Sequence, residues 1–425
     1  MLNRSIGKWS LVLLIINSII GAGIFGLPSK IFALSGVYSL LAFGACAVVV
    51  MVFILCFAEV SSRFDKTGGP YLYAFNALGK FPAFLTGWLL LLSRIFNYAT
   101  LINLLVIYLS FFSPLFSNPL IRATCILFIT ASLTFINYIG VKDSTRVNNI
   151  LTIAKLLPLI TFVIIGLFNI QPDLLISDKA PEFSSFSTSV LLLIFAFGGF
   201  ESVLINTGEI KNPKKTLPFA LITATIIVAI FYCLIQFVSI GTLPTLAVSE
   251  KPLAEAARGF MGNAGGNFIA LGAIISITGT LNAIVLGGSR LPFAFSSEGQ
   301  FPKIFSYIHP KRLTPTLSLI LFIAITTVVS LVWSFFAALA IGAIIRVLVY
   351  ILVCISMIRL RRKNPDKKDY FKLRFGYFFA VTGILLAAWL LTSSKQNELR
   401  DISICILVGI VIYGLYERFK GPAVK

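Results

Sequence analysis

Two glycine-rich runs inside apolar segments are the places where this sequence could hold a charged ligand. The first, GAGIFGLP at 21–28, lies in the middle of an apolar stretch from Ser10 to Ala33. The second, FGGFES at 197–202, contains an acid, Glu201. Glycine costs about 1 kcal/mol relative to alanine in a helix interior, and Pro28 removes a backbone donor. Neither run therefore favours a continuous helix.

A helix that breaks inside lipid leaves backbone groups without partners unless they line a cavity or are buried in protein. The freed N–H groups at the start of the second half-helix would attract an anion such as a carboxylate. The freed carbonyls at the end of the first half-helix would attract a cation such as an ammonium. An α-amino acid carries both groups. The alternative, which stays open at this point, is close packing of helices through small residues.

Composition places these runs in a membrane protein. The chain has 425 residues, of which 58% are hydrophobic and 12% charged, and its mean hydropathy is +0.95. This composition predicts an all-α polytopic membrane protein. The formal charge of +19 would also suit a nucleic-acid partner, but 24 of the 35 Lys and Arg residues lie in the termini and every second loop. We therefore expect a lipid bilayer and no nucleic acid as partner, with both termini in the cytoplasm.

The apolar segments predict twelve membrane spans in the plasma or inner membrane. They are 10–33, 37–60, 81–112, 119–139, 150–169, 188–207, 217–242, 266–296, 316–333, 335–358, 375–393 and 401–417. The basic cluster at 359–363 is predicted to be a stop anchor beside anionic lipid.

No enzyme chemistry is indicated. The six cysteines all lie in apolar segments, and the single histidine, His309, lies in a loop. Neither a nucleophile–base pair nor a set of metal ligands is recognisable in the sequence. We expect no cofactor and no metal.

Several motifs together resemble the amino acid–polyamine–organocation (APC) superfamily, and within it the amino acid permeases. They are GAGIFGLP at 21–28, Glu59 with GGPYLY at 68–73, FGGFES at 197–202 with EIKNPKKTLP at 209–218, Arg290 with EGQFP at 298–302, and Tyr350 with LRR at 360–362.

This resemblance implies a leucine-transporter-like fold of 5+5 inverted repeats, with twelve transmembrane helices of which helices 1 and 6 are interrupted. The inverted-repeat core would be 1–365, with repeat 1 at about 10–169 and repeat 2 at about 188–358. Residues 366–425 would add two transmembrane helices and a cytoplasmic C-terminus. The implied function is secondary active transport of an amino acid by alternating access, as a proton symporter. The alternatives are an amino acid/amine exchanger and a substrate sensor that does not transport.

The resemblance also assigns a substrate site. Backbone amides of Ala22, Gly23 and Ile24 would hold the carboxylate, and carbonyls near Ile19, Phe195 and Gly198 would hold the ammonium, with Gly199 completing the second break. The side chains of Phe195 and Ile284 would form a wall for the substrate's side chain.

Ionisable residues inside the spans are functional candidates because an intramembrane charge is costly. Arg94 shares a face with Asn97 and Tyr98 and could clamp an acidic substrate, or could pair internally with Glu201. Glu201 could accept a proton or act as a gate ligand, or could cap a half-helix.

Three further charges inside the spans also have two interpretations each. By the resemblance, Lys155 takes the place of sodium and carries the coupling proton; a structural cation is the alternative. Arg290 and Arg346 are interpreted as snorkelling residues or partners in a cytoplasmic gate.

Overall fold

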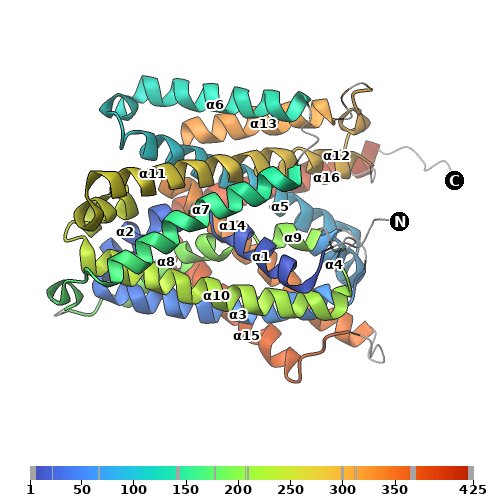
Figure 1. Cartoon of the computed structure of the whole chain (residues 1–425). Coiled ribbons are helices and arrows are strands. Elements are labelled where there is room, and N and C mark those ends of the chain that lie inside the picture. The colour runs from blue at the N-terminus through green and yellow to red at the C-terminus, as the bar shows by residue number, and fades with distance from the viewer. Residues whose placement is uncertain are drawn as a thin grey trace. The chain divides into compact units, whose positions relative to one another are not determined.

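The computed structural model shows a chain built from helices (Figure 1). It describes residues 6–21, 23–65, 68–139, 144–176, 179–205, 207, 210–297, 301–310, 312, 314–363 and 370–419. Over these residues no named strand occurs, and the β-type pairing consists of an isolated parallel bridge between Ile6 and Ile210. The prediction of an all-helical protein is confirmed for this part of the chain.

Each predicted apolar range contains at least one helix. The helices are α1 (Lys8–Ile19), α2 (Gly23–Ser35), α3 (Ser39–Ser61), α4 (Gly69–Leu78), α5 (Lys80–Leu109), α6 (Pro119–Ile139), α7 (Ser144–Leu167), α8 (Phe183–Phe197), α9 (Glu201–Ile205), α10 (Pro213–Thr242), α11 (Pro252–Gly288), α12 (Arg290–Ser297), α13 (Thr316–Val332), α14 (Phe335–Lys363), α15 (Gly376–Thr392) and α16 (Gln396–Phe419). Among the described residues, seven helical stretches are long and apolar enough to cross a membrane, and shorter apolar helices accompany them.

The chain packs as two compact units, each made from three separate stretches. Unit 1 comprises Met1–Thr86, Leu159–Ile269 and Ala343–Ser394, and unit 2 comprises Gly87–Pro158, Ala270–Gly342 and Lys395–Lys425. Both glycine-rich runs belong to unit 1. The candidate site can therefore be built within one unit.

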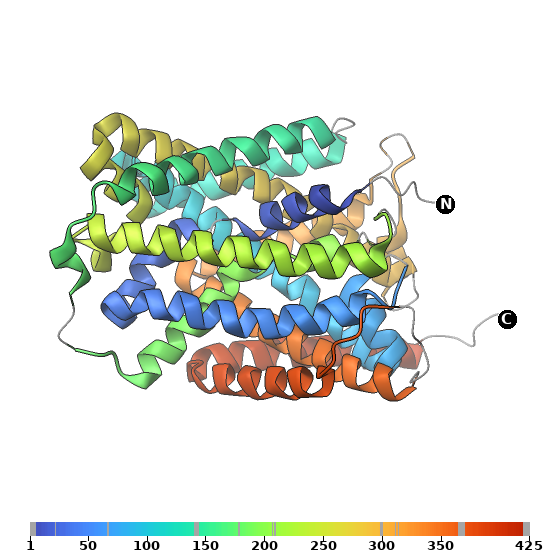
Figure 2. The ribbon, with the colours of Figure 1, turned by 60° about the horizontal axis from the view of Figure 1, so that its bottom comes forward.

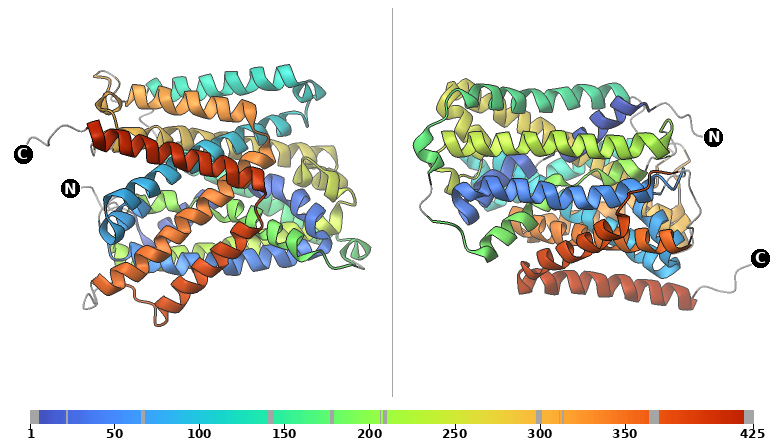
Figure 3. Two further views of the ribbon diagram at one scale, coloured as in Figure 1. Left: turned by 180° about the vertical axis from the view of Figure 1, so that it is seen from behind. Right: turned by 90° about the horizontal axis from the view of Figure 1, so that it is seen from below.

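In unit 1, the long helix α3 lies between α10 and α15 (Figures 2 and 3). The helices α2 and α8 pack against each other and against α3. Aromatic side chains fill the space where α3, α14 and the chain after α8 meet: Phe57 lies 5.1 Å from Phe200 and 5.4 Å from Tyr350, between ring centroids. These rings are fully buried, so they fix the position of α14 against the second glycine run.

One end of unit 1 is held by a buried carboxylate, Glu59 at the end of α3. Glu59 accepts hydrogen bonds from Arg361 Nε at 2.7 Å, from Arg63 at 3.3 Å and from the Leu373 N–H at 2.9 Å. Arg63 also donates to Tyr370 Oη at 2.6 Å. The network joins the ends of α3 and α14 to the segment that begins at Tyr370.

This network corrects the prediction for the basic cluster at 359–363. Arg359, Arg362 and Lys363 are exposed, as an anchor beside lipid requires, but Arg361 is buried and faces Glu59. A charge at the end of an apolar span resembles an anchor in sequence, whereas pairing with a carboxylate on another helix turns it inward.

Unit 2 is tied together by polar groups between its helices. Tyr98 on α5 donates to Thr130 Oγ1 on α6 at 2.9 Å, and Asn137 on α6 donates to Asn282 Oδ1 on α11 at 2.8 Å. The helices α6 and α13 run side by side (Figure 1). The Trp88 indole N–H donates to the Cys405 carbonyl at 2.9 Å and thereby joins α5 to α16.

Candidate functional site

The first glycine run ends one helix and begins another, as the sequence predicts. α1 stops at Ile19, Ile20 is extended with φ −70° and ψ 95°, and α2 starts at Gly23. The N–H groups of the first turn of α2 have no acceptor within their own helix. Gly21 stays partly accessible, as do Asn17 and Ser18 before it. Ala22, one of the predicted carboxylate ligands, lies outside the described residues.

The second glycine run also interrupts its helix. α8 ends at Phe197, Gly198 is extended with φ −81° and ψ 171°, and α9 begins at Glu201. Gly199 has φ +118°, which L-residues with a side chain rarely adopt. The prediction that two helices are interrupted at these glycines is therefore confirmed in the local backbone.

The two interruptions touch each other. A Cβ on Gly199 would overlap the carbonyl group of Ser18, so the backbones meet there without a side chain between them. A Cβ on Gly23 would lie 2.8 Å from Ala196 Cα. The close-packing interpretation of the glycines thus holds for Gly23 and Gly199, whereas a Cβ on Gly21 would meet only the Ile19 carbonyl oxygen, at 3.9 Å.

A buried tyrosine joins the ends of both first half-helices. Tyr232 on α10 is fully buried, and its hydroxyl lies 3.2 Å from the carbonyl oxygen of Ile19 and 3.2 Å from that of Ala196. A hydroxyl has one proton, so it donates to one of these carbonyls at a time. The negative ends of α1 and α8 therefore meet at one point, beside the positive end of α2.

An arginine from α14 completes the second break. Arg346 is 6% exposed, donates from Nη1 to the Phe195 carbonyl at 2.7 Å, and has its Nε 3.6 Å from Glu201 Oε1. A Cβ on Gly198 would overlap its guanidinium, which explains the need for glycine at that position. Tyr350, one turn further along α14, donates its hydroxyl hydrogen to the same Glu201 oxygen.

Both oxygens of Glu201 are engaged. Oε1 faces Arg346 and Tyr350, and Oε2 accepts the Gly199 N–H at 2.7 Å. The capping interpretation of Glu201 therefore describes its geometry: the carboxylate satisfies a backbone donor freed by the break. Its partner charge is Arg346.

The predicted ammonium ligands differ in what they still offer. The Phe195 carbonyl accepts from Arg346 and, at 3.3 Å, from the Gly198 N–H, so its two lone pairs are taken. The Ile19 carbonyl accepts from the Tyr232 hydroxyl, its one recorded partner among the described residues. Among the predicted site residues, Ile19, Gly23, Phe195, Gly198 and Gly199 are brought together, with Ile24 buried in the first turn of α2.

The remaining predicted residues belong to unit 2. Tyr98 is fully buried with its hydroxyl on Thr130, Ile284 is buried on α11, and Arg94 is half-buried on α5. Lys155 on α7 is 5% exposed. On α5, the buried amide oxygen of Asn97 has no hydrogen-bond donor among the residues that the structure describes.

Two residues at the site were missed or misread in the sequence. Tyr232 resembles an ordinary core aromatic in an apolar span. The snorkelling interpretation of Arg346 is wrong, because the residue is buried in the middle of α14 at the second break, whereas its role as a gate partner stays a prediction. The spacing of Arg346 and Tyr350, four residues apart and hence on one helix face, was the available signal.

Comparison with known proteins agrees with the geometry. A family profile described as amino acid permease matches residues 6–414. The chain belongs to the amino acid permease family. It is similar to three Bacillus subtilis proteins. The branched-chain amino acid permease BcaP is 27% identical, over 98% of this chain and 94% of the relative. The serine/threonine exchanger SteT is 27% identical, over 98% of both chains. The methylthioribose transporter is 28% identical, over 98% of this chain and 94% of the relative.

The packing of this permease predicts different effects for two neighbouring glycines. Gly23→Ala forces a methyl group against the backbone of α8, and overpacking of this kind costs about 1–3 kcal/mol of stability. Gly21→Ala places its methyl group in open space and should leave stability nearly unchanged. The measurement is the thermal unfolding midpoint of each purified variant in detergent. Equal midpoints for the two variants would contradict the close approach of α2 and α8.

Proposed function

We propose that this permease is a secondary active transporter that moves an amino acid across the plasma or inner membrane by alternating access. The observation that carries the proposal is the meeting of the two helix interruptions at Ser18 and Gly199. Membership of the amino acid permease family supports it, as does the function named for two of the relatives.

The ends of the half-helices match the two charges of an amino acid. The first turn of α2, at Gly23 and Ile24, presents N–H groups and a positive dipole end to a carboxylate. The carbonyls of Ile19 and Gly198 at the ends of α1 and α8 would receive the ammonium. The Phe195 carbonyl would take part only if Arg346 moved away. Gly21, which is partly accessible, lets a ligand approach the backbone.

The charges around the second break favour a neutral or acidic substrate over arginine or a polyamine. The only acid there among the described residues, Glu201, is already paired with Arg346 and bonded to Tyr350 and Gly199. A cationic substrate side chain at this break would find no unpaired carboxylate, and it would approach the guanidinium of Arg346. Like charges in a low-dielectric site repel strongly.

The proposed topology is the leucine-transporter-like arrangement of twelve transmembrane helices. α1 with α2, and α8 with α9, would be the interrupted helices of two inverted five-helix repeats, at about 10–169 and 188–358. Two interrupted segments in corresponding places of two halves support this arrangement. The excess of Lys and Arg in alternate loops supports placing both termini in the cytoplasm.

For energy coupling we propose a proton carried by Lys155. Its burial on α7 supports a functional role, because a charge inside a span is costly to keep. The alternatives are an amino acid/amine exchanger, with one relative named as a serine/threonine exchanger, and a sensor that binds without transport. Glu201 is the second candidate for the proton, although its hydrogen bonds already serve the break.

A ligand screen tests the proposed substrate chemistry. Purified protein is heated in detergent with each of the twenty amino acids, and an amino acid that stabilises it is compared with its decarboxylated amine and its N-acetyl derivative. A ligand at a hundred times its Kd stabilises the folded state by about 2.7 kcal/mol. We expect one or more neutral or acidic amino acids to raise the thermal unfolding midpoint. The decarboxylated amine and the N-acetyl derivative, which each lack one of the two charged groups, should not raise it.

Two results of this screen would contradict the proposal. One is stabilisation by arginine or putrescine without a response to neutral or acidic amino acids. The other is an equal shift with the amine or the N-acetyl derivative, which would mean that the half-helix ends do not bind the two charges. The ligand screen also includes methylthioribose, because one relative is named as a methylthioribose transporter.

Accumulation in liposomes tests the coupling proposal. With an acidic exterior, wild-type protein should concentrate the substrate, whereas Lys155→Ala should bind it and lose accumulation. Lys155→Arg serves as a control because it keeps a permanent charge and should not release a proton either. Counterflow in the same liposomes separates a transporter from a sensor. If Lys155→Ala concentrates substrate as well as wild type, the proton travels elsewhere.

A further inference from the structure

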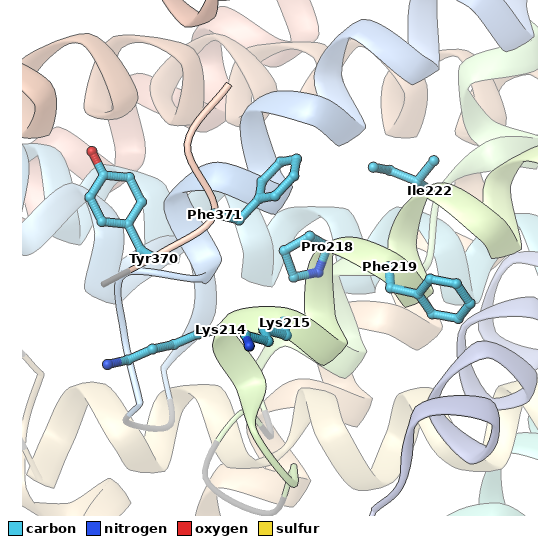
Figure 4. A pocket seen from close by; sticks show the side chains of 7 residues that line it. All are labelled: Lys214, Lys215, Pro218, Phe219, Ile222, Tyr370 and Phe371. Atoms are coloured by element: carbon cyan, nitrogen blue, oxygen red, sulfur yellow. The ribbon is translucent and has the colours of Figure 1, made fainter. Parts of the chain in front are cut away.

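A second candidate binding site lies at the end of unit 1, away from the two helix breaks. It is a cavity of about 480 Å³ between the start of α10 and the segment at Tyr370 and Phe371 (Figure 4). Two lysines, Lys214 and Lys215, stand at one end of it, and Ile222 stands at the other. The substrate site described above uses none of these residues.

One wall of the cavity is held rigidly. Tyr370 Oη accepts a hydrogen bond from Arg63 at 2.6 Å, and the Phe371 N–H donates to Ser62 Oγ at 3.1 Å. Arg63 is itself paired with the buried Glu59. A wall fixed by these part-buried hydrogen bonds is pre-formed for a ligand, so little ordering opposes binding.

The described lining residues of the cavity carry positive charge. Besides Lys214 and Lys215, the ammonium of Lys8 lies 3.5 Å from the centre of the Phe219 ring, which lines the cavity. No acidic side chain is among the described lining residues. Two ammonium groups on the lining and a third beside one lining ring favour an anion, and basic pockets at a membrane surface bind anionic head groups.

The lining residue Ile222 also belongs to an exposed apolar face of α10. Phe219, Ile222, Ile226 and Ile230 follow one another at intervals of three or four residues, so they share one face of α10. Ile226 is 47% exposed and Ile230 is 59% exposed, in a helix long and apolar enough to cross a membrane. Trp9, which lies edge-on to Phe219 at 5.5 Å between ring centroids, is 63% exposed and suits the interface between water and lipid.

We propose that this cavity binds one anionic phospholipid. The lysines Lys8, Lys214 and Lys215 hold its phosphate-bearing head group, and an acyl chain lies along the stripe from Ile222 to Ile230. The continuity of charge and apolar surface selects a lipid over a free phosphate, because a soluble anion would use the lysines alone and leave the stripe unused.

The experiment measures lipid binding to the purified full-length protein by native mass spectrometry. Wild-type protein in detergent is titrated with phosphatidylglycerol, with phosphatidylcholine of the same chains, and with glycerol 1-phosphate. We expect preferential retention of phosphatidylglycerol. Lys214→Ser/Lys215→Ser should weaken its binding by roughly tenfold or more, since each lysine near a membrane surface contributes substantially to binding an anionic lipid.

A matched variant separates the cavity from general surface charge. The double variant Lys211→Ser/Lys372→Ser also removes two positive charges, but from exposed lysines that lie close by in the sequence and do not line the cavity. It should bind phosphatidylglycerol nearly as tightly as wild type does. The proposal is overturned if both double variants lose binding equally, or if Lys214→Ser/Lys215→Ser binds as wild type. Equal retention of phosphatidylcholine would overturn it as well, and so would competition by glycerol 1-phosphate at the same concentration as the lipid.

Discussion

A buried guanidinium holds the interrupted part of this structure in place. Arg346 bonds the carbonyl that ends α8 and pairs with the carboxylate that begins α9, while Gly198 makes room for it. Breaking such a pair by removing one partner costs about 3–5 kcal/mol. The stability of a whole domain is only about 5–15 kcal/mol, so the loss of either partner would remove a large part of it.

The other contacts of the site follow from that unwound segment. Because α8 stops early, Gly199 can lie against Ser18, and the Tyr232 hydroxyl can reach the ends of α1 and α8 together. Gly23 then meets Ala196, which brings the start of α2 to the same place. The result is a region where one helix start and two helix ends converge, with a protein cation already serving one of the freed carbonyls.

The local features of this arrangement could be predicted from the sequence. Apolar runs of about 20 residues predicted the helices, and glycine runs predicted where two of them end. These features depend on neighbouring residues. They could therefore be recognised without knowing what packs against them.

Partners on distant helices could not be predicted in this way. Tyr350 and Glu201 are separated by 149 residues, and Arg361 and Glu59 by 302. An arginine near the end of an apolar span has the same sequence pattern whether it reaches lipid head groups or turns toward a buried acid. Arg361 was misread for this reason, and the buried position of Arg346 likewise depends on an acid from a distant helix. Likewise, the small size of Gly23 and Gly199 suggested room for a ligand, whereas much of that room is filled by another backbone.

The central claim, that the pair of Arg346 and Glu201 stabilises the second break, is tested most directly by a double-mutant cycle. Unfolding free energies are measured in mixed micelles for wild type, Glu201→Gln, Arg346→Met and the double variant. Each single variant leaves one buried group without its partner. The double variant should therefore lose less unfolding free energy than the two single variants lose together, and the difference, which is the coupling energy, should be at least about 1 kcal/mol. The claim is contradicted if the loss in the double variant equals the sum of the two single losses to within about 0.5 kcal/mol, because independent sites behave in that way.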